Sequence, residues 1–203
     1  MKNFTQEFCD KLSAKSRELE KISSVEIVPV VAQRSDPYFD FRVQLALVGA
    51  LAASIADAAF STRWIEAALA AAVAFAVVFA VVSIPWVLRR ILPTALAREA
   101  VVDQADAAFL HEEVFATRER TGVLIFVSLF ERDVFVIGDK GLARFVPDAY
   151  WGQLGRSLAQ DFKAHEPGTS FLEALEKLIR EVAPHFPAHA DNPNEISDEL
   201  RRR

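Results

Sequence analysis

Two long apolar stretches limit what this chain can fold into. Val43–Phe60 and Ile65–Leu88 are about 18 and 24 residues long, against the roughly 20 apolar residues that a helix needs to cross a bilayer. The charged residues between positions 43 and 88 are Asp57, Arg63 and Glu66. Because Ser61–Arg63 leaves room only for a tight turn, the pattern predicts two antiparallel helices.

We interpret residues 41–92 as a transmembrane helical hairpin. The alternative is a pair of helices buried in a large soluble core, which Asp57 and Glu66 favour. A soluble domain of this length rarely buries a helix that is apolar on every face, so the membrane interpretation is preferred. The two carboxylates are then expected at the far interface rather than in an intramembrane proton or ion site. Trp64 and Trp86, near the ends of the second stretch, are expected in the headgroup layer.

The distribution of arginine predicts the orientation of the hairpin. Five arginines lie on the side of the two chain ends, whereas Arg63 alone lies at the turn. The five are Arg34, Arg42, Arg89, Arg90 and Arg98. Since basic residues are retained on the cytoplasmic side, both termini are expected in the cytoplasm. No apolar run follows Lys2, so we expect no secretory signal peptide and assign membrane entry to the hairpin.

Charge and cysteine content exclude two further classes of protein. The net charge of −5 argues against a nucleic-acid-binding surface, which needs clustered lysine and arginine. The single cysteine, Cys9, cannot form an internal disulfide and lacks the spacing of a metal-binding motif. It is expected to be a small core residue in a reducing compartment.

Regular secondary structure is predicted on both sides of the hairpin. Helical periodicity predicts a helix over Asn3–Lys21, and the β-branched run Val25–Val31 predicts a strand. Pro29 has no donor for a sheet ladder, which favours an edge position or an irregular strand end. After the hairpin, a helix is predicted over Ala95–Arg120, with Thr121–Gly122 as its C-terminal cap.

Two strands then follow closely, and helices follow them. Val123–Leu129 is an almost unbroken apolar run, the pattern of a strand covered on both faces. A turn at Glu131–Asp133 leads into Val134–Ile137, which predicts a β-hairpin. Ser170 and Glu173 have the spacing of a capping box at the start of a last helix. The apolar residues of the helix between are Trp151, Leu154, Leu158 and Phe162.

This order of elements predicts an α/β fold, a three-layer α/β/α sandwich with a small mixed sheet, interrupted by the two-helix transmembrane hairpin. Residues 1–36 and 94–183 are expected to form one discontinuous domain, because strands come from both sides of the hairpin. From residue 184 the chain is rich in proline and then polar. That composition predicts a loosely ordered tail over residues 184–203.

Several segments resemble the TPM domain family. Arg120–Leu129, followed by a second strand and Gly138–Gly141, is similar to the central hairpin of the TPM domain. His185–Pro187 with Asn194–Glu195 resembles the tail of a bacterial membrane branch of that family, in which a two-helix hairpin follows the first strand. Glu26–Val31 resembles that first strand.

The resemblance implies a compact α/β/α sandwich in a bacterial inner membrane. Acid phosphatase activity or calcium binding is proposed for some relatives, and a role in membrane-complex maintenance or receptor modulation for others. Two departures weaken the transfer of enzymatic activity. The glycine that usually precedes the first strand is replaced within Ser23–Glu26, and the acidic, glycine-containing segment that opens many secreted relatives is missing before Phe4.

Three acidic residues are the candidates for a divalent-cation site. Hard cations such as Ca²⁺ prefer clustered oxygen ligands, and Glu131, Asp133 and Asp139 flank the ends of the strand pair. The alternative is that all three are solvated turn residues beside Arg132 and Lys140.

Other chemistry has less support in the sequence. His185, His189 and Asp191 have side chains that suit zinc, but the surrounding prolines disturb any regular spacing, and a polar tail explains them better. The sequence contains no P-loop, no Cys-x5-Arg motif and no Asp-x-Asp pair, so catalytic residues for phosphate-ester hydrolysis are unknown.

Two functions are therefore compared. The preferred one is a membrane-tethered interaction, assembly or maintenance factor without strong catalytic activity, whose α/β domain docks on another membrane protein. The alternative, supported by resemblance alone, is a weak divalent-cation-dependent acid phosphatase or a calcium-binding domain. Small residues at Gly49, Ala53 and Ala56 would let the two apolar helices, or a second copy, pack closely.

Overall fold

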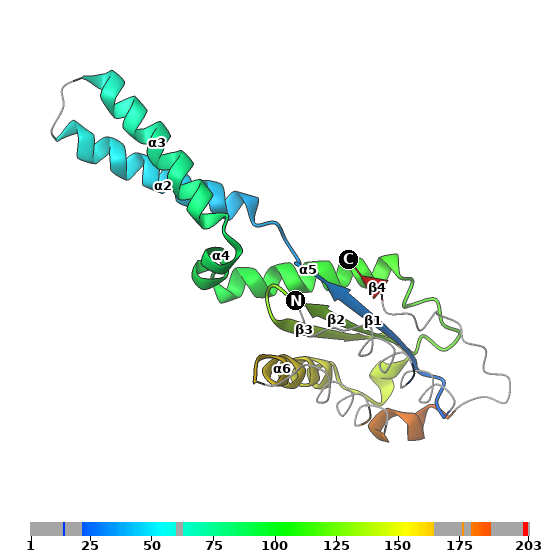
Figure 1. Ribbon diagram of the computed structural model, residues 1–203. Coiled ribbons are helices and arrows are strands. Elements are labelled where there is room, and N and C mark those ends of the chain that lie inside the picture. The colour runs from blue at the N-terminus through cyan, green and yellow to red at the C-terminus, as the bar shows by residue number, and fades with distance from the viewer. Residues whose placement is uncertain are drawn as a thin grey trace. The chain divides into compact units, whose positions relative to one another are not determined.

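The computed structural model describes residues 14, 22–59, 63–164, 176, 180–187 and 201–202 (Figure 1). The chain divides into two compact units. The first consists of Met1–Ser35 and Ala97–Arg203, and the second of Asp36–Leu96.

The secondary structure alternates between the two units because the second is inserted into the first. In chain order the elements are β1 (Glu26–Ala32), α2 (Phe39–Ala58), α3 (Trp64–Val82), α4 (Pro85–Ile91), α5 (Thr94–His111), β2 (Gly122–Ser128), β3 (Asp133–Gly138), the 3-10 helix η1 (Leu142–Arg144), α6 (Asp148–Ala164), the 3-10 helix η2 (Ala183–His185) and β4 (Arg201–Arg202).

A mixed sheet with the strand order β3-β2-β1-β4 forms the centre of the first unit. β1 and β2 pair in parallel, from Glu26 with Gly122 to Ala32 with Ser128. β2 and β3 pair antiparallel, which confirms the predicted hairpin. β4 adds two residues in parallel to β1. The small mixed sheet expected from the sequence is therefore present.

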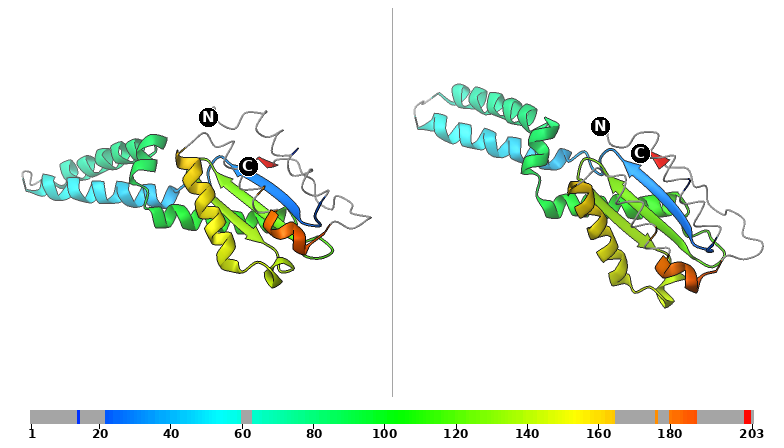
Figure 2. Two further views of the ribbon diagram at one scale, coloured as in Figure 1. Left: turned by 90° about the horizontal axis from the view of Figure 1, so that it is seen from below. Right: turned by 60° about the horizontal axis from the view of Figure 1, so that its bottom comes forward.

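Helices cover both faces of this sheet, which confirms the three-layer fold (Figure 2). Successive side chains of a strand point to opposite faces, so β2 contributes to two separate cores. Its odd-numbered residues pack with α6, and its even-numbered residues pack with α5. All seven residues of β2 are buried, as expected for a strand covered on both faces. The residues of α6 and α5 in the two cores are Trp151, Leu154, Leu158 and Ala159 on α6 and Val101, Ala105 and Ala108 on α5.

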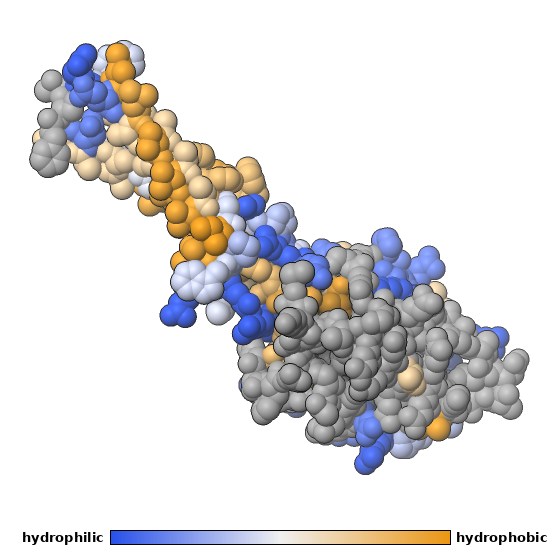
Figure 3. Space-filling view, viewed as in Figure 1, coloured by the Kyte–Doolittle hydropathy of each residue, from blue (hydrophilic) through white to orange (hydrophobic). Residues whose placement is uncertain are grey.

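The second unit contains two antiparallel helices, α2 and α3, which lie side by side (Figures 1 and 2). Both are long and apolar enough to cross a membrane: their most apolar 18-residue windows have mean hydropathies of 1.5 and 2.5. Only 6% of each window is buried, unlike the core helices of a soluble protein. Figure 3 shows apolar surface along this helix pair, with hydrophilic residues at both of its ends.

Contacts at Gly49 and Arg42 help to hold α2 against α3. A Cβ added at Gly49, near the middle of α2, would lie 2.7 Å from Cγ2 of Val78, so the helices approach closely at this small residue. Near the start of α2, Nη1 of Arg42 donates to the Ser83 hydroxyl at 3.4 Å. The Arg42 guanidinium also lies 5.6 Å from the ring centroid of Phe79.

The second apolar stretch, predicted as one helix over Ile65–Leu88, is two helices. α3 ends at Val82, and a new helix begins at Pro85. Proline lacks a backbone N–H and clashes with the preceding helical turn, so it ends a helix, but it suits the first position of the next one. Trp86 therefore lies on the short helix α4 rather than on α3.

The helix predicted over Ala95–Arg120 is also shorter than expected, because α5 ends at His111. The chain turns there, and Glu113 takes a left-handed backbone conformation with φ 51°. The loop brings the carbonyl oxygen of Val114 so close to Gly122 that an added Cβ would lie 2.0 Å from it. Gly122 is therefore the first residue of β2 rather than a helix cap, and its missing side chain makes room for the loop.

Part of the predicted loose tail belongs to the folded unit, so that prediction is wrong for residues 184–187 and 201–202. Phe186 is buried in the α6-side core, and its carbonyl accepts hydrogen bonds from the Ser24 N–H at 3.0 Å and the Ser23 hydroxyl at 2.8 Å. Burial of this aromatic ring outweighs the polar composition around it. Nε of Arg201 contacts Oε2 of Glu112 at 2.5 Å, which helps to hold β4.

The remaining predictions have mixed outcomes. The helix predicted to carry Trp151, Leu154, Leu158 and Phe162 is confirmed as α6. Pro29 lies within β1 opposite Ile125, while β4 on the other side pairs only with Val30 and Val31. Cys9, most of the first predicted helix and most of the last one lie outside the described residues.

We predict that Gly122→Ala destabilises the protein by about 3 kcal/mol, because the added methyl group overlaps the backbone carbonyl of Val114. For a chain of this size, that loss corresponds to a decrease in melting temperature of about 6 to 12 °C. Thermal unfolding of the purified full chain, followed by circular dichroism in detergent, measures the shift.

Gly152→Ala is the matched control. The nearest heavy atom to a Cβ added at Gly152 is Nη1 of Arg156 at 3.5 Å, an ordinary contact, and the residue lies within α6. This change should stabilise the protein by about 1 kcal/mol, since alanine has the higher helix propensity. Equal melting temperatures for the two variants would contradict the close packing at Gly122.

Candidate functional site

The three predicted cation ligands lie at two different ends of β3. Glu131 lies in the β2–β3 turn, Asp133 is the first residue of β3, and Asp139 follows its last residue. A strand of six residues, at about 3.3 Å each, puts Asp139 roughly 20 Å from Asp133. Glu131 and Asp133 are therefore neighbours, while Asp139 belongs to a separate cluster.

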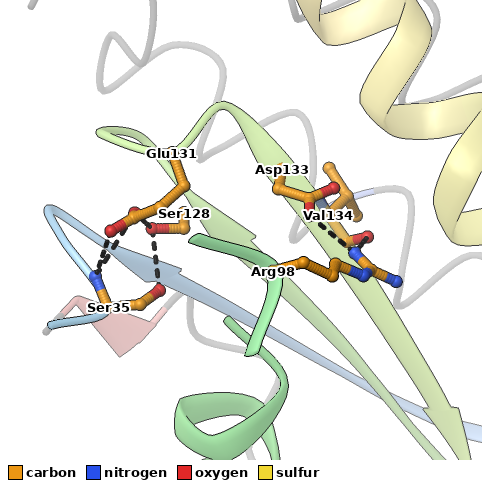
Figure 4. Close-up of polar contacts among 6 residues, drawn as sticks. All are labelled: Ser35, Arg98, Ser128, Glu131, Asp133 and Val134. Atoms are coloured by element: carbon orange, nitrogen blue, oxygen red, sulfur yellow. Dashed lines mark hydrogen bonds and ion pairs between the residues drawn. The ribbon is translucent and has the colours of Figure 1, made fainter. Parts of the chain in front are cut away.

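Glu131 holds the segment that follows β1 (Figure 4). The backbone N–H of Ser35 donates to Oε1 and Oε2 of Glu131 at 3.2 and 3.3 Å. The buried hydroxyl of Ser128, at the end of β2, also donates to Glu131 and accepts a hydrogen bond from the Ser35 hydroxyl at 3.0 Å. Beside them, the Arg34 guanidinium lies 4.1 Å from the ring centroid of Phe130. The turn thus contacts Arg34 and Ser35, the second and third residues after β1.

Asp133 holds the first part of α5 in the same way. Nη1 of Arg98 donates to Oδ2 of Asp133 at 2.7 Å and to the carbonyl of Val134 at 3.2 Å (Figure 4). The same guanidinium lies 4.8 Å from the ring centroid of Phe135. The Arg98 side chain is 34% exposed and that of Asp133 17%, so the pair is partly shielded from water. Such a pair is worth more than a fully exposed one, because water screens it less.

We call Ser35, Arg98, Ser128, Glu131 and Asp133 the junction cluster. The chain leaves the first unit after Ser35 and returns to it at Ala97. The cluster therefore binds the last residue before the chain leaves and the second residue after it returns. Two segments that are distant in sequence are fixed on one short turn, and this turn defines where the helical unit is connected.

The second cluster joins the two ends of the β2–β3 hairpin. Nε and Nη2 of Arg120 donate to the two oxygens of Asp139 at 2.6 and 3.0 Å, and the Lys140 N–H donates to Oδ1 at 2.7 Å. The pKa of Arg120 is raised, chiefly because its guanidinium donates hydrogen bonds to Asp139 and also because of the negative charge of that carboxylate, although burial acts in the opposite direction. Arg120 has φ 59°, and its carbonyl accepts from the Gly141 N–H at 2.9 Å. The cluster closes the end of the sheet opposite the junction cluster.

The positions of the three carboxylates do not fit one shared cation site. In the part of the chain that the structure describes, no three His, Cys, Asp or Glu side chains come together as metal ligands would. Asp133 and Asp139 each accept from a guanidinium, and Glu131 accepts from a backbone N–H and a hydroxyl. A bound cation would have to replace these bonds.

Two candidate reactive side chains among the described residues, Ser128 and His185, are engaged in contacts within the fold. The Ser128 hydroxyl is fully buried although a carboxylate lies beside it. His185, a candidate zinc ligand, lies in η2, where its ring stacks on Phe145 with centroids 4.8 Å apart. His189 and Asp191 lie outside the described residues. The geometry of the clusters therefore indicates that they fix the backbone.

The sequence analysis did not identify the partners of the acidic residues. Ser35 and Glu131 are 96 positions apart, and nothing in the local pattern links them. The Arg120–Asp139 pair had a detectable signal, because the hairpin register places Val123 opposite Gly138. Arg120 lies three residues before Val123, and Asp139 lies one residue after Gly138. Both side chains therefore belong to the same end of the hairpin.

We predict that Asp139→Ala destabilises the protein by about 2 kcal/mol, because the Arg120 guanidinium and the Lys140 N–H both lose their acceptor. The Asp139 side chain is only 3% exposed, so water replaces it poorly. Urea unfolding of the full chain in detergent measures the change in the free energy of unfolding.

Lys140→Ala is the neighbouring control and should change stability by less than about 0.5 kcal/mol, since its side chain is exposed. Calcium should leave the stability of the wild-type chain unchanged. A calcium-dependent rise in melting temperature that Asp139→Ala abolishes would instead make this residue a cation ligand.

Comparisons with known proteins support one family. A family model described as the TPM domain matches residues 88–181. No curated protein matches the chain. Among solved structures, the NMR structure of BA42 protein from the psychrophilic bacterium Bizionia argentinensis has a TM-score of 0.62 and 18% sequence identity, and covers 100% of this chain and 98% of that chain. At this identity the likeness shows the fold alone. Residues 88–181 therefore match the TPM domain, the family that the central hairpin resembles.

Proposed function

We propose that this chain is a membrane-anchored TPM-domain protein. The α2–α3 hairpin spans the inner membrane, the α/β unit and both termini lie in the cytoplasm, and the α/β unit binds another membrane protein. The observation that carries the proposal is the exposed apolar surface of α2 and α3, whose most apolar windows are only 6% buried. The large side chains that are more than half exposed include Leu47, Val48, Leu51 and Ile55 on α2 and Leu69, Val73 and Val77 on α3.

The free energy of this exposed surface favours a bilayer. Burying one leucine, isoleucine or valine side chain is worth about 1.5 to 3 kcal/mol. These seven side chains together would gain on the order of 10 kcal/mol by leaving water, which is comparable to the whole stability of an ordinary domain. The backbones of α2 and α3 can enter lipid without unsatisfied polar groups, because a helix hydrogen-bonds its own N–H and carbonyl groups.

The arginine distribution supports the orientation. Arg42 lies in the first turn of α2, and Arg89 and Arg90 lie on α4, which follows the end of α3. At the connection between the helices, Arg63 is paired with Glu66 at 3.2 Å, so little net charge remains there. The positive-inside bias therefore favours a cytoplasmic location for the ends of the hairpin.

The contacts of the acidic residues support an interaction role over catalysis. Glu131, Asp133 and Asp139 hold a chain segment, a helix and a strand end, respectively. A general acid or base needs to reach a substrate proton, and these carboxylates are engaged in bonds that maintain the fold. The α/β unit thus acts as a rigid binding module that the hairpin confines to the membrane.

The topology predicts a specific labelling pattern. In a Cys9→Ser background, Ser61→Cys places one thiol in the sequence between α2 and α3, and Gln33→Cys places one in the exposed segment after β1. A membrane-impermeant maleimide should label Ser61→Cys in intact spheroplasts and Gln33→Cys only after lysis. Carbonate washing should leave both variants in the membrane.

Labelling of Gln33→Cys in intact spheroplasts would show that the orientation is the reverse of the proposed one. Complete release by carbonate would contradict the membrane anchor itself.

The interaction role predicts copurification without hydrolysis. The full chain, purified in mild detergent, should retain one stoichiometric membrane-protein partner and should not hydrolyse p-nitrophenyl phosphate, with or without Ca²⁺ or Mg²⁺. The alternative, a divalent-cation-dependent acid phosphatase, gains support if turnover occurs and Asp133→Asn or Asp139→Asn abolishes it. Lys140→Ala is the control for nonspecific loss of activity.

A further inference from the structure

The short helix α4 has one strongly exposed face. Trp86 is 74% exposed, and the two arginines of the last turn, Arg89 and Arg90, are also exposed. Residues three and four positions apart lie on the same face of a helix, so both arginines flank the indole ring. Leu88 lies on the opposite face and is fully buried. α4 therefore carries one aromatic and two arginine side chains on its exposed face.

The charge near this face is positive. No acidic residue occurs between Glu66 and Glu99, a segment that contains α4 and its connections. At the start of α2, by contrast, Asp36 and Asp40 lie close in sequence to Arg42. The surplus positive charge at this end of the second unit is therefore carried by α4.

The position of α4 in the chain places this face next to the end of α3. α3 ends at Val82, and α4 begins at Pro85 after two intervening residues. The apolar residues Ile84 and Ile91 at the two ends of α4 are 49% and 41% exposed. A helix with exposed arginine, tryptophan and isoleucine beside a membrane span has the composition of an interfacial element.

We propose, on the basis of the membrane anchoring proposed above, that α4 binds anionic phospholipid headgroups. Arg89 and Arg90 hold the phosphate groups of the cytoplasmic leaflet, and Trp86 lies in the headgroup layer between them. Guanidinium groups suit this ligand, because their planar donors form paired hydrogen bonds to phosphate oxygens. Each basic residue at an anionic membrane surface increases lipid affinity by about fivefold.

Quenching of tryptophan fluorescence by brominated lipid tests the proposal. The full chain carrying Trp64→Phe is reconstituted in phosphatidylcholine bilayers with a minor fraction of brominated phosphatidylglycerol or of brominated phosphatidylcholine. Trp86 is then the remaining tryptophan on the hairpin and α4, since Trp151 is buried in the α6-side core. Phosphatidylglycerol should quench more strongly, and Arg90→Gln should reduce the preference about fivefold. Arg89→Gln/Arg90→Gln should remove it.

Arg144→Gln/Arg156→Gln, which removes the same charge from exposed positions of the α/β unit, should keep the preference. Equal quenching by the two lipids in carbonate-resistant wild-type chain would overturn the proposal while the membrane anchor stands. Failure of the wild-type chain to insert would instead contradict the proposed function. Should the double variant fail to insert, Arg90→Gln alone decides, since an unchanged preference in that variant would also overturn the proposal.

Discussion

Parallel pairing of β1 with β2 is the interaction on which the rest of the structure depends. Two parallel strands need a crossover connection, because the chain must return to the end of the sheet from which it started. Here α5 covers one face of the sheet on this return, and the inserted unit Asp36–Leu96 precedes it. The helical unit therefore occupies a connection that the strand pairing requires in any case. Both of its chain connections lie within the crossover, after β1 and near the start of α5, where an insertion leaves the ladder of β1 and β2 intact.

The junction cluster follows from this arrangement. A crossover that carries a large insertion has two loose points, one where the chain leaves and one where it returns. The β2–β3 turn holds both, through Ser35 on Glu131 and Arg98 on Asp133. Ordering a chain segment has an entropic cost of about 1 to 2 kcal/mol per residue, and a few partly buried hydrogen bonds offset it at the residues they fix. The acidic residues of this turn thus serve the connection to the helical unit.

Local patterns predicted the elements well where a helix or strand has one clear face or is buried on both, as in β2 and α6. They failed where a distant contact decides. One such contact is the packing of the Val114 carbonyl against Gly122 in the loop that follows α5. Another is the burial of Phe186 in the α6-side core, which holds a segment whose composition predicted a loose tail. The acidic candidates were found, but their arginine and serine partners come from other parts of the chain. Pro85 was different, since its effect on α3 is local and was predictable from the residue itself.

The distribution of charge between the units adds a constraint on how such a chain sits at a membrane. Residues 36–96 contain four basic and four acidic side chains, so the net charge of −5 belongs to the α/β unit. An anionic lipid surface repels such a unit within about one Debye length, roughly 8 to 10 Å at physiological salt. Under the proposed anchoring, the two units therefore differ in what their charge favours. The arginines of α4 favour contact with anionic headgroups, whereas the acidic α/β unit favours water.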